Sequence, residues 1–258
     1  MNFSSSVHSL WIGKIGEIEQ LCINSFSHHG FVFNLWTYDE LFCELPGVKV
    51  RNANQILDRS LVYKIKQNNS PSVAAFSDLF RYKLLHEFGG IWVDMDNVCL
   101  NSFNIQGAYC FPSLSSWYLL GREKSEYGGK EIDSWFIKAP KGSDAMKYCF
   151  DTSYELKETN PPWGTFGPCL LNKAVRKYDL LKYASDQFMP INWNFAHYYV
   201  DRNILFRNYF NFFKRRSYTA HLYREVLNRR GLLESSQIKK NSVLGILLKN
   251  MDVSLPVS

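Results

Sequence analysis

The sequence lacks any apolar stretch long enough to cross a bilayer, although 46% of its 258 residues are hydrophobic. Its first ten residues, MNFSSSVHSL, lack the basic start and the long apolar segment of a secretory signal. We therefore expect a cytoplasmic protein. A hydrophobic content of 46% with 16% aromatic residues indicates a globular chain, and its length fits one domain with at most a small appendage.

Two kinds of motif are also missing. The six cysteines show neither a CxxC pair nor the spacing of a zinc site, so we interpret them as reduced thiols with structural roles. The segment GKIG at 13–16 is not the glycine fingerprint of a dinucleotide-binding fold. These absences argue against a domain stabilised by disulfides, against a zinc finger and against a Rossmann-type cofactor site.

Strand and helix patterns alternate from the amino terminus onward. This alternation predicts an α/β fold with a central mixed sheet flanked by helices. Ligands of such sheets bind outside the carboxyl ends of the strands. The expected strands are Val7–Ile12, Phe31–Trp36, Val48–Arg51, Ala108–Phe111 and Trp135–Lys138. The expected helices are Glu17–His29, Asp39–Leu45, Asn54–Lys66 and Ser143–Glu158, and Ser113–Ile132 is expected to be a mobile loop.

The stretch Ser72–Leu100 is the most informative part of the chain. Ser70 can cap a helix and Pro71 suits the first helical position. Gly89–Gly90 is expected to end that helix, and Ile91–Val93 is typical of a short buried strand. The apolar residues at helical spacing, which predict an inward face, are Val73, Phe76, Phe80, Leu84 and Phe88.

Two carboxylates, Asp94 and Asp96, follow this strand. In an extended chain they point to the same side, about 7 Å apart, where a divalent cation would relieve their repulsion. Oxygen ligands favour Mg²⁺ or Mn²⁺, although carboxylates at strand ends also serve as caps or solvated loop residues. Asp78 and Arg81 are neighbours on the surface of the preceding helix. They could bind the substrate, or they could form a surface ion pair that contributes about 0.2–0.5 kcal/mol to stability.

The segment SDLFRYKLLHEFGGIWVDMD at 77–96 resembles the signature of the Asp-x-Asp sugar-transferase family. This family includes yeast mannosyltransferases and many bacterial capsular and lipopolysaccharide glycosyltransferases, and it is similar to the glucosyltransferase domain of clostridial toxins. The resemblance implies a GT-A fold, placed at residues 1–235 with a C-terminal helical tail at 236–258. It also implies a retaining, metal-dependent transfer from a nucleotide sugar in bacterial surface polysaccharide synthesis.

The resemblance also implies roles for individual residues. Asp94 and Asp96 would hold Mn²⁺ or Mg²⁺, with His221 as a third ligand, although His221 could merely begin a helix. Trp11 would stack on the base of a UDP- or GDP-sugar, although without the resemblance a buried core tryptophan would be the preferred interpretation. The donor would be transferred to a glycan or lipid-linked glycan acceptor. The expected catalytic residues are Asp94, Asp96 and Arg81, and the expected substrate contacts are Trp11, Asp78, Arg81, Trp92, Asp94 and Asp133.

Two other functions fit some of these residues. The segment DMDNV after an apolar strand also resembles the first motif of haloacid-dehalogenase-type phosphatases, in which Asp94 would be the nucleophile and Asp96 an acid/base. That family usually also needs a pair of adjacent acidic residues at the end of a later apolar strand, and this sequence has no such pair after Asp96. A non-catalytic domain that binds sugar or metal is the third alternative.

Positive charge is concentrated near the carboxyl terminus. Residues 201–250 contain eleven Lys or Arg against three Asp or Glu, whereas the whole chain carries a net charge of +6. No nucleic-acid-binding motif accompanies these charges, so we expect no nucleic-acid partner. A peripheral contact with an anionic membrane and a core helix with solvated charges both remain open.

Overall fold

The computed structural model describes residues 6–39, 47–113, 132–180, 183–184, 187–233 and 238–253. Most of the predicted helix Asp39–Leu45 and of the predicted loop Ser113–Ile132 lies outside these residues. The chain forms two compact units. The first unit comprises Met1–Ile12, Val32–Asp94 and Asn104–Ala184, and the second comprises Gly13–Phe31, Met95–Phe103 and Ser185–Ser258.

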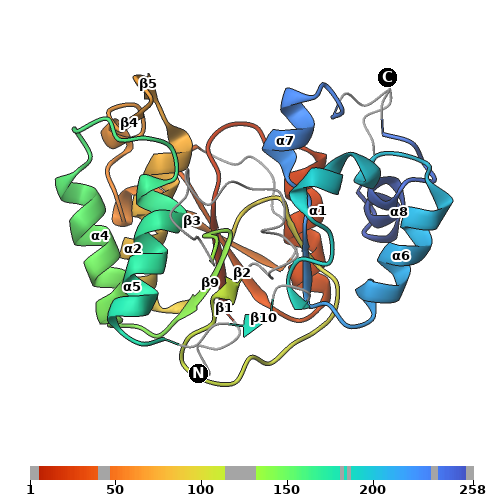
Figure 1. The fold of residues 1–258 in the computed structure, drawn as a ribbon, viewed down its shortest axis with the longest axis horizontal. Helices are drawn as coiled ribbons and strands as arrows, with labels where there is room; N and C mark the ends of the chain where they lie inside the picture. Colours follow the sequence, from red (N-terminus) through yellow and green to blue (C-terminus); the bar gives the residue numbers. More distant parts are fainter. Residues whose placement is uncertain are drawn as a thin grey trace. The chain divides into compact units, whose positions relative to one another are not determined.

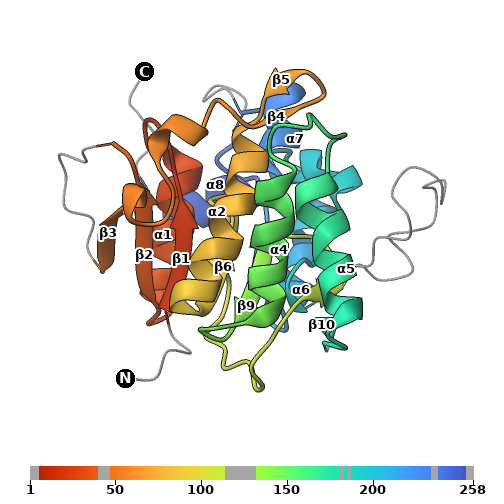
Figure 2. The same ribbon diagram turned by 90° about the vertical axis from the view of Figure 1, so that its left-hand side faces the viewer.

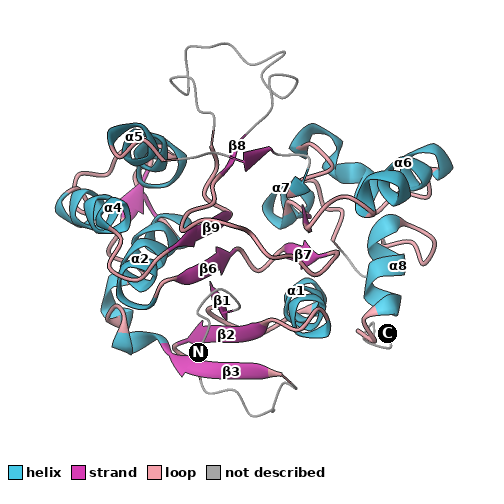
Figure 3. Cartoon of the chain, turned by 90° about the horizontal axis from the view of Figure 1, so that it is seen from below, coloured by secondary structure: helices cyan, strands magenta, loops and turns pink. Residues whose placement is uncertain are grey.

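The first unit is built on a five-stranded sheet of order β3-β2-β1-β6-β9 (Figure 3). Neighbouring strands are parallel except for β9, which runs antiparallel to β6. This mixed sheet confirms the predicted α/β class, and its parallel strands β1 and β6 are almost fully buried, as such strands usually are. The strands are β1 (Ser6–Leu10), β2 (Val32–Thr37), β3 (Val48–Asn52), β6 (Gly90–Val93) and β9 (Phe136–Ala139).

Three helices pack together in the first unit: α2 (Val73–Phe88), α4 (Asp144–Glu155) and α5 (Leu170–Lys177). They lie side by side in both views of the ribbon (Figures 1 and 2). Helix α2 contacts β1, β6 and β9, so its apolar side chains fill the space against the sheet. The large members of this core include Trp36, Phe76, Phe80, Trp92 and Phe166.

Helix α2 begins later than predicted. Ser72 is its N-cap, and the Ser72 Oγ accepts a hydrogen bond of 3.1 Å from the Ala75 N–H. Ser70–Pro71 instead forms β5, which pairs with β4 (Lys66–Gln67). Val73 and Phe88, at the two ends of the helix, are exposed, so the predicted inward face is correct only for its middle members.

The predicted glycine stop of α2 is confirmed. Gly89 is the C-cap with a φ of 68°, a conformation that side chains rarely adopt. A Cβ on Gly89 would also lie 2.4 Å from the Lys141 backbone nitrogen, so the chain has no room for a larger residue there.

Two other predictions are wrong in detail. Residues 54–66 do not form one helix but contain the short 3₁₀ turns η2 (Ala53–Gln55) and η3 (Arg59–Leu61). Polar caps break the segment, since Asn52 and Asp58 each accept a backbone N–H two residues ahead. The predicted strand Ala108–Phe111 is reduced to a single bridge at Cys110, followed by β8 (Pro112–Ser113), which pairs with β10 (Tyr183–Ala184).

The second unit combines a small ladder with helices. Strand β11 runs antiparallel to β7, and α1 packs against β7 and α8 (Figure 3). Helix α8 lies within the predicted helical tail at 236–258, whose boundary at residue 235 stays a prediction. The elements are α1 (Glu17–His28), β7 (Asn97–Cys99), η6 (Trp193–Tyr199), α6 (Ile204–Lys214), β11 (Thr219–His221), α7 (Arg224–Arg229) and α8 (Val243–Asn250).

No helix within the described ranges combines the length and the apolar character needed to cross a bilayer.

A buried histidine in β1 makes the stability of the first unit depend on pH. The Trp36 Nε1–H donates a hydrogen bond of 3.2 Å to His8 Nδ1. Burial, and to a smaller extent the positive charge of Arg51, lowers the pKa of His8 from 6.5 to about 4. Between these pH values only the unfolded chain binds the proton. The free energy of unfolding should therefore fall as pH drops from 6.5 to about 4, by up to roughly 3 kcal/mol.

The variant His8→Gln isolates this contribution, because a glutamine oxygen can accept from Trp36 without titrating. Urea unfolding of both proteins at several pH values measures it. The stability of the wild type relative to the variant should be constant above pH 6.5 and should decrease below it. Parallel pH profiles for the two proteins would contradict the assignment.

Candidate functional site

Polar and aromatic residues of the first unit gather at the carboxyl ends of neighbouring strands. Trp11 follows β1 and Asp94 follows β6, and these two strands are parallel neighbours. Trp11 is partly exposed and donates its backbone N–H to the Trp36 carbonyl. This edge is where sheets of this class bind ligands. The structure therefore places Trp11 where the sequence predicted, at the same edge as Asp94.

Asp94 is held by two groups. Its Oδ1 accepts a hydrogen bond of 2.9 Å from Trp92 Nε1 and lies 3.3 Å from an Arg81 guanidinium nitrogen. The carboxylate remains about one third exposed, whereas Trp92 is only 1% exposed. The Trp92 ring therefore has almost no exposed surface, and its indole N–H orients the Asp94 carboxylate. The contact of Trp92 with the substrate stays a prediction.

Arg81 lies inside the first unit and is 4% exposed. It donates to the Ser77 carbonyl, the Ser77 hydroxyl and the Ser134 carbonyl, and its guanidinium lies 5.0 Å from the centre of the Trp92 ring. Burial lowers the pKa of Arg81, but Asp94 and then Asp78 outweigh that effect, so the guanidinium stays charged. Its contacts are those of a residue that positions other groups.

Asp78 is also buried, at 8% exposure, which contradicts a surface ion pair with Arg81. The Asp78 Oδ1 lies 3.4 Å from Arg81 Nε and 3.4 Å from the Ser134 hydroxyl. Burial raises the pKa of Asp78 to about 7, and Asp94 adds to the rise while Arg81 opposes it. One guanidinium thus faces two carboxylates, and Asp94 is its stronger partner.

The π-helical turn η4 (Thr165–Cys169), directly before α5, packs over Asp78. A Cβ on Gly167 would lie 2.8 Å from the Asp78 Oδ2, so only glycine lets the backbone approach the carboxylate this closely. The Tyr82 hydroxyl donates to the Phe166 carbonyl at 2.9 Å and fixes η4 against α2. These contacts leave Asp78 little surface for the predicted contact with sugar hydroxyls.

Asp133 precedes β9, beside the carboxyl end of β6. Its Oδ1 accepts the Ser134 N–H at 2.8 Å, and the Ser134 carbonyl in turn accepts from Arg81. Asp133 remains partly exposed, so it can still meet a ligand at this edge. The structure therefore brings Trp11, Asp94 and Asp133 to one edge of the sheet in the first unit.

In the second unit, Asp96 and His221 lie together. Strand β11 pairs with β7 so that His221 is opposite Asn97, the residue after Asp96. The Asp96 Oδ1 lies 3.2 Å from the His221 Nε2. The predicted neighbourhood of Asp96 and His221 is thus present in this unit, and the strand pairing creates it.

Asp96 also accepts hydrogen bonds from the turn between β11 and α7 and from the first residue of α7. The Arg224 N–H donates to Asp96 Oδ2 at 2.8 Å, and the Leu222 N–H donates to the Asp96 carbonyl at 2.9 Å. Burial raises the pKa of Asp96, but His221 and the Arg224 N–H outweigh it, so the pKa lies below its usual value. Asp96 is therefore ionised at neutral pH.

A buried acid, Glu19 of α1, supports Arg224. The Glu19 Oε1 lies 2.8 Å from the Arg224 Nε, and its Oε2 accepts the Gly16 N–H at 2.8 Å. Burial raises the pKa of Glu19, while Arg224 counteracts the rise. No local sequence pattern points to Glu19 or Arg224, because they meet only through the tertiary fold. Ser77 could have been found, since it precedes Arg81 by one helical turn.

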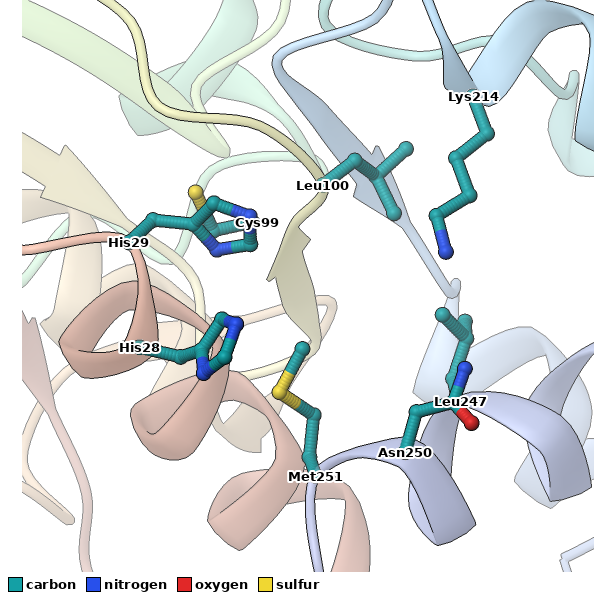
Figure 4. Close-up of a pocket in the computed structure, with 8 residues that line it drawn as sticks. All are labelled: His28, His29, Cys99, Leu100, Lys214, Leu247, Asn250 and Met251. Carbon is teal, nitrogen blue, oxygen red and sulfur yellow. The ribbon is translucent and has the colours of Figure 1, made fainter.

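A cavity of about 220 Å³ lies elsewhere in the second unit and contains none of the predicted site residues. His28 and His29 form one side of it, and Lys214 and Leu247 face them (Figure 4). Burial raises the pKa of the Cys99 thiol in its wall to about 12, so this cysteine stays protonated and unreactive.

Residues 56–163 match the model of a family described as capsular polysaccharide synthesis protein. The match covers α2, β6 and the Asp-x-Asp segment and ends before His221. It confirms the resemblance to capsular glycosyltransferases that residues 77–96 indicated. A search of curated proteins found no matching relative.

Solved structures share the fold. The galactosyltransferase LgtC, in complex with donor and acceptor sugar analogues, is similar with a TM-score of 0.55 and 11% identity, covering 98% of this chain and 97% of that one. An active-site mutant of LgtC gives a TM-score of 0.56 and 10% identity, with the same coverage. The PaToxG glycosyltransferase is similar at a TM-score of 0.46 and 15% identity, covering 96% of this chain and 87% of that one.

The likeness to LgtC confirms the predicted GT-A-like fold, which carries a mixed sheet flanked by helices. The chain is therefore similar in fold to solved glycosyltransferases and, over residues 56–163, similar in sequence to a family of capsular polysaccharide synthesis proteins.

Proposed function

We propose that the protein is a retaining, metal-dependent glycosyltransferase that moves a sugar from a nucleotide diphosphate sugar to a glycan acceptor in surface polysaccharide synthesis. The observation that carries this proposal is the contact between Asp96 and His221. Asp96 lies two residues after Asp94, a carboxylate that Trp92 and Arg81 orient. The capsular family match supports the biological setting.

The pair fits a divalent cation. Ligand bonds of about 2.1 Å at right angles bring two ligand atoms to about 3 Å from each other. The observed separation of Asp96 Oδ1 and His221 Nε2 is 3.2 Å, close to that spacing. Two carboxylates with one imidazole suit Mn²⁺, and Mg²⁺ is the alternative.

Asp94, Asp96 and His221 would hold this cation. Only Met95 separates the two carboxylates, so chain connectivity keeps them within reach of one ion. A bound cation would neutralise the charge of the diphosphate leaving group as the glycosidic bond breaks. The Arg224 N–H fixes Asp96 Oδ2, which leaves Oδ1 directed at His221. Asp94 would bind the cation or the ribose of the donor.

Arg81 acts as a positioning residue in this scheme. Its direct contact with the donor was predicted, but its 4% exposure and its contacts with Ser77, Ser134 and Asp94 favour orienting the Asp94 carboxylate. Asp78 would form an ion pair with Arg81 and hold the guanidinium in place, rather than bind sugar hydroxyls.

Trp11 and Asp133 are partly exposed at the sheet edge, and we assign them to the substrate. An indole at a strand end can stack on the base of a UDP- or GDP-sugar. The carboxylate of Asp133 can accept hydrogen bonds from sugar hydroxyls. A glycan or a lipid-linked glycan would be the acceptor.

The decisive assay incubates the protein with a panel of UDP- and GDP-sugars, with and without Mn²⁺. The proposal predicts metal-dependent release of the nucleotide from one donor. Asp96→Asn should lower turnover by about 100-fold or more, because it removes a main electrostatic contact. Asp151→Asn breaks only the exposed pair with Lys147 and should leave turnover unchanged.

Other outcomes of that assay contradict the proposal. Release of phosphate from simple monoesters would favour a phosphatase that uses Asp94 and Asp96. Binding of a sugar or metal without turnover would favour a non-catalytic domain. Near-normal turnover in Asp96→Asn would reject the metal assignment.

His221 gives a separate test of the metal site. Replacing His221 by Ala should raise the Mn²⁺ concentration needed for half-maximal rate by about tenfold, because one ligand is lost. His28→Ala is the matched control, because it removes an exposed imidazole that lines the 220 Å³ cavity and lies outside the candidate metal site. An equal metal requirement in wild type and His221→Ala would show that the imidazole is not a ligand.

If Trp92 orients Asp94, removing its indole N–H should lower both stability and kcat, whereas removing another buried indole N–H should lower stability alone. Trp92→Phe and Trp36→Phe each remove one indole hydrogen bond from a buried ring, to Asp94 and to His8 respectively. Both should lower stability by roughly 1–3 kcal/mol. Only Trp92→Phe should also lower kcat, measured at saturating donor. Equal kcat values in the two variants would contradict the role of Trp92.

A further inference from the structure

Helix α6 in the second unit turns apolar side chains outward. Leu205, Tyr209 and Phe212 are 76%, 48% and 59% exposed, and their spacing of four and three residues places them on one helix face. Ile204 beside them is 54% exposed, and Phe210 is the residue of α6 that is buried. A helix on the surface of a globular protein usually shows the reverse pattern, so this face is suited to contact something.

Ring contacts extend this face onto η6. Phe195 is 52% exposed and stacks on Tyr198, whose ring lies 4.9 Å from that of Phe206. Phe206 in turn contacts Tyr209 at 6.3 Å. The aromatic face is therefore continuous across two elements and larger than an isolated exposed side chain, which would need no explanation.

Positive charges border the same face. Helix α6 contains no acidic residue between Ile204 and Lys214, and Arg215 and Arg216 follow it directly. Both arginines are exposed, and the Arg216 guanidinium lies 5.5 Å from the centre of the Phe212 ring. Exposed apolar side chains and cations thus occur together.

We propose that this docking face, formed by Phe195, Ile204, Leu205, Tyr209, Phe212, Arg215 and Arg216, binds the surface of a membrane that contains anionic phospholipids. Aromatic rings favour the boundary between lipid head groups and acyl chains, and an amphipathic helix lies in that plane. Each nearby Lys or Arg adds about 1 kcal/mol of attraction to an anionic surface.

The charges argue against other occupants. A second copy of the chain would bring Arg215 and Arg216 against a face with the same positive charges, which repel. A nucleic acid would stack on aromatic rings, but the most exposed apolar residue of the face is the aliphatic Leu205. Lipid accommodates both aliphatic and aromatic side chains beside the cations.

The docking face is independent of the transfer reaction, because its exposed residues lie on α6, just after it and on η6, and not in the candidate metal site. If the acceptor is lipid-linked, as the proposed function allows, the docking face would keep the enzyme on the leaflet that carries it.

Sedimentation of the full chain with vesicles tests the proposal. The wild type should bind phosphatidylcholine vesicles that contain about 30 mol% phosphatidylglycerol, should not bind pure phosphatidylcholine, and should be released by about 0.5 M salt. The double variant L205S/F212S should lower the partition coefficient by more than about tenfold. The double variant R215Q/R216Q should lower it by about 30-fold.

Matched variants control for a general loss of exposed apolar surface or charge. Y63S/W163S removes two rings that are 64% and 52% exposed in the first unit, and K49Q/K66Q removes two exposed cations there. Both should bind vesicles like the wild type, and all variants should keep the wild-type Tm.

Three results would overturn the proposal: equal binding to both vesicle types, binding to neither, or equal losses in the control variants. Self-association that L205S/F212S abolishes would instead assign the face to a second copy. Nucleotide-sugar turnover is measured on the same proteins without vesicles, so a failure of the docking face and a failure of the proposed reaction are told apart.

Discussion

The antiparallel pairing of β11 with β7 is the constraint on which the candidate metal site depends. It places His221 opposite the residue after Asp96, and it aligns the following turn so that the Arg224 N–H reaches the Asp96 carboxylate. Without this pairing, Asp96 would be a solvated carboxylate in a loop. The buried acid Glu19 then holds Arg224, so α1 also contributes to the position of Asp96.

A second support lies in the first unit, where a buried guanidinium faces two carboxylates. Burial raises the pKa of Asp78 to about 7 although Arg81 opposes the rise, and Asp94 is the stronger partner of the Arg81 guanidinium. Burying one partner of such an arrangement is costly unless its hydrogen bonds are complete. The contacts of Arg81 with Ser77 and Ser134 complete them.

Much of this was predictable because it is local. The periodicity of α2, the glycine stop at Gly89 and the carboxylates after β6 follow from residues close in sequence, as does the mixed sheet from alternating patterns. The start of α2 was misplaced because two caps, Ser70 and Ser72, compete, and the second lies three residues before the Ala75 N–H that it satisfies. The burial of Arg81 and Trp92 could not be read from spacing, since it depends on the loop before β9 and on neighbouring strands. The contact of Arg224 with Asp96 joins residues 128 positions apart, which no local pattern reports.

The central claim is that Asp96 and His221 hold a divalent cation for a nucleotide-sugar donor. Titration of Mn²⁺ in the presence of a nucleoside diphosphate, followed by electron paramagnetic resonance, tests it most directly. The account predicts one tightly bound Mn²⁺ per chain in the wild type and in Asp151→Asn, and weak binding in Asp96→Asn. Equal Mn²⁺ binding by the wild type and Asp96→Asn would contradict it.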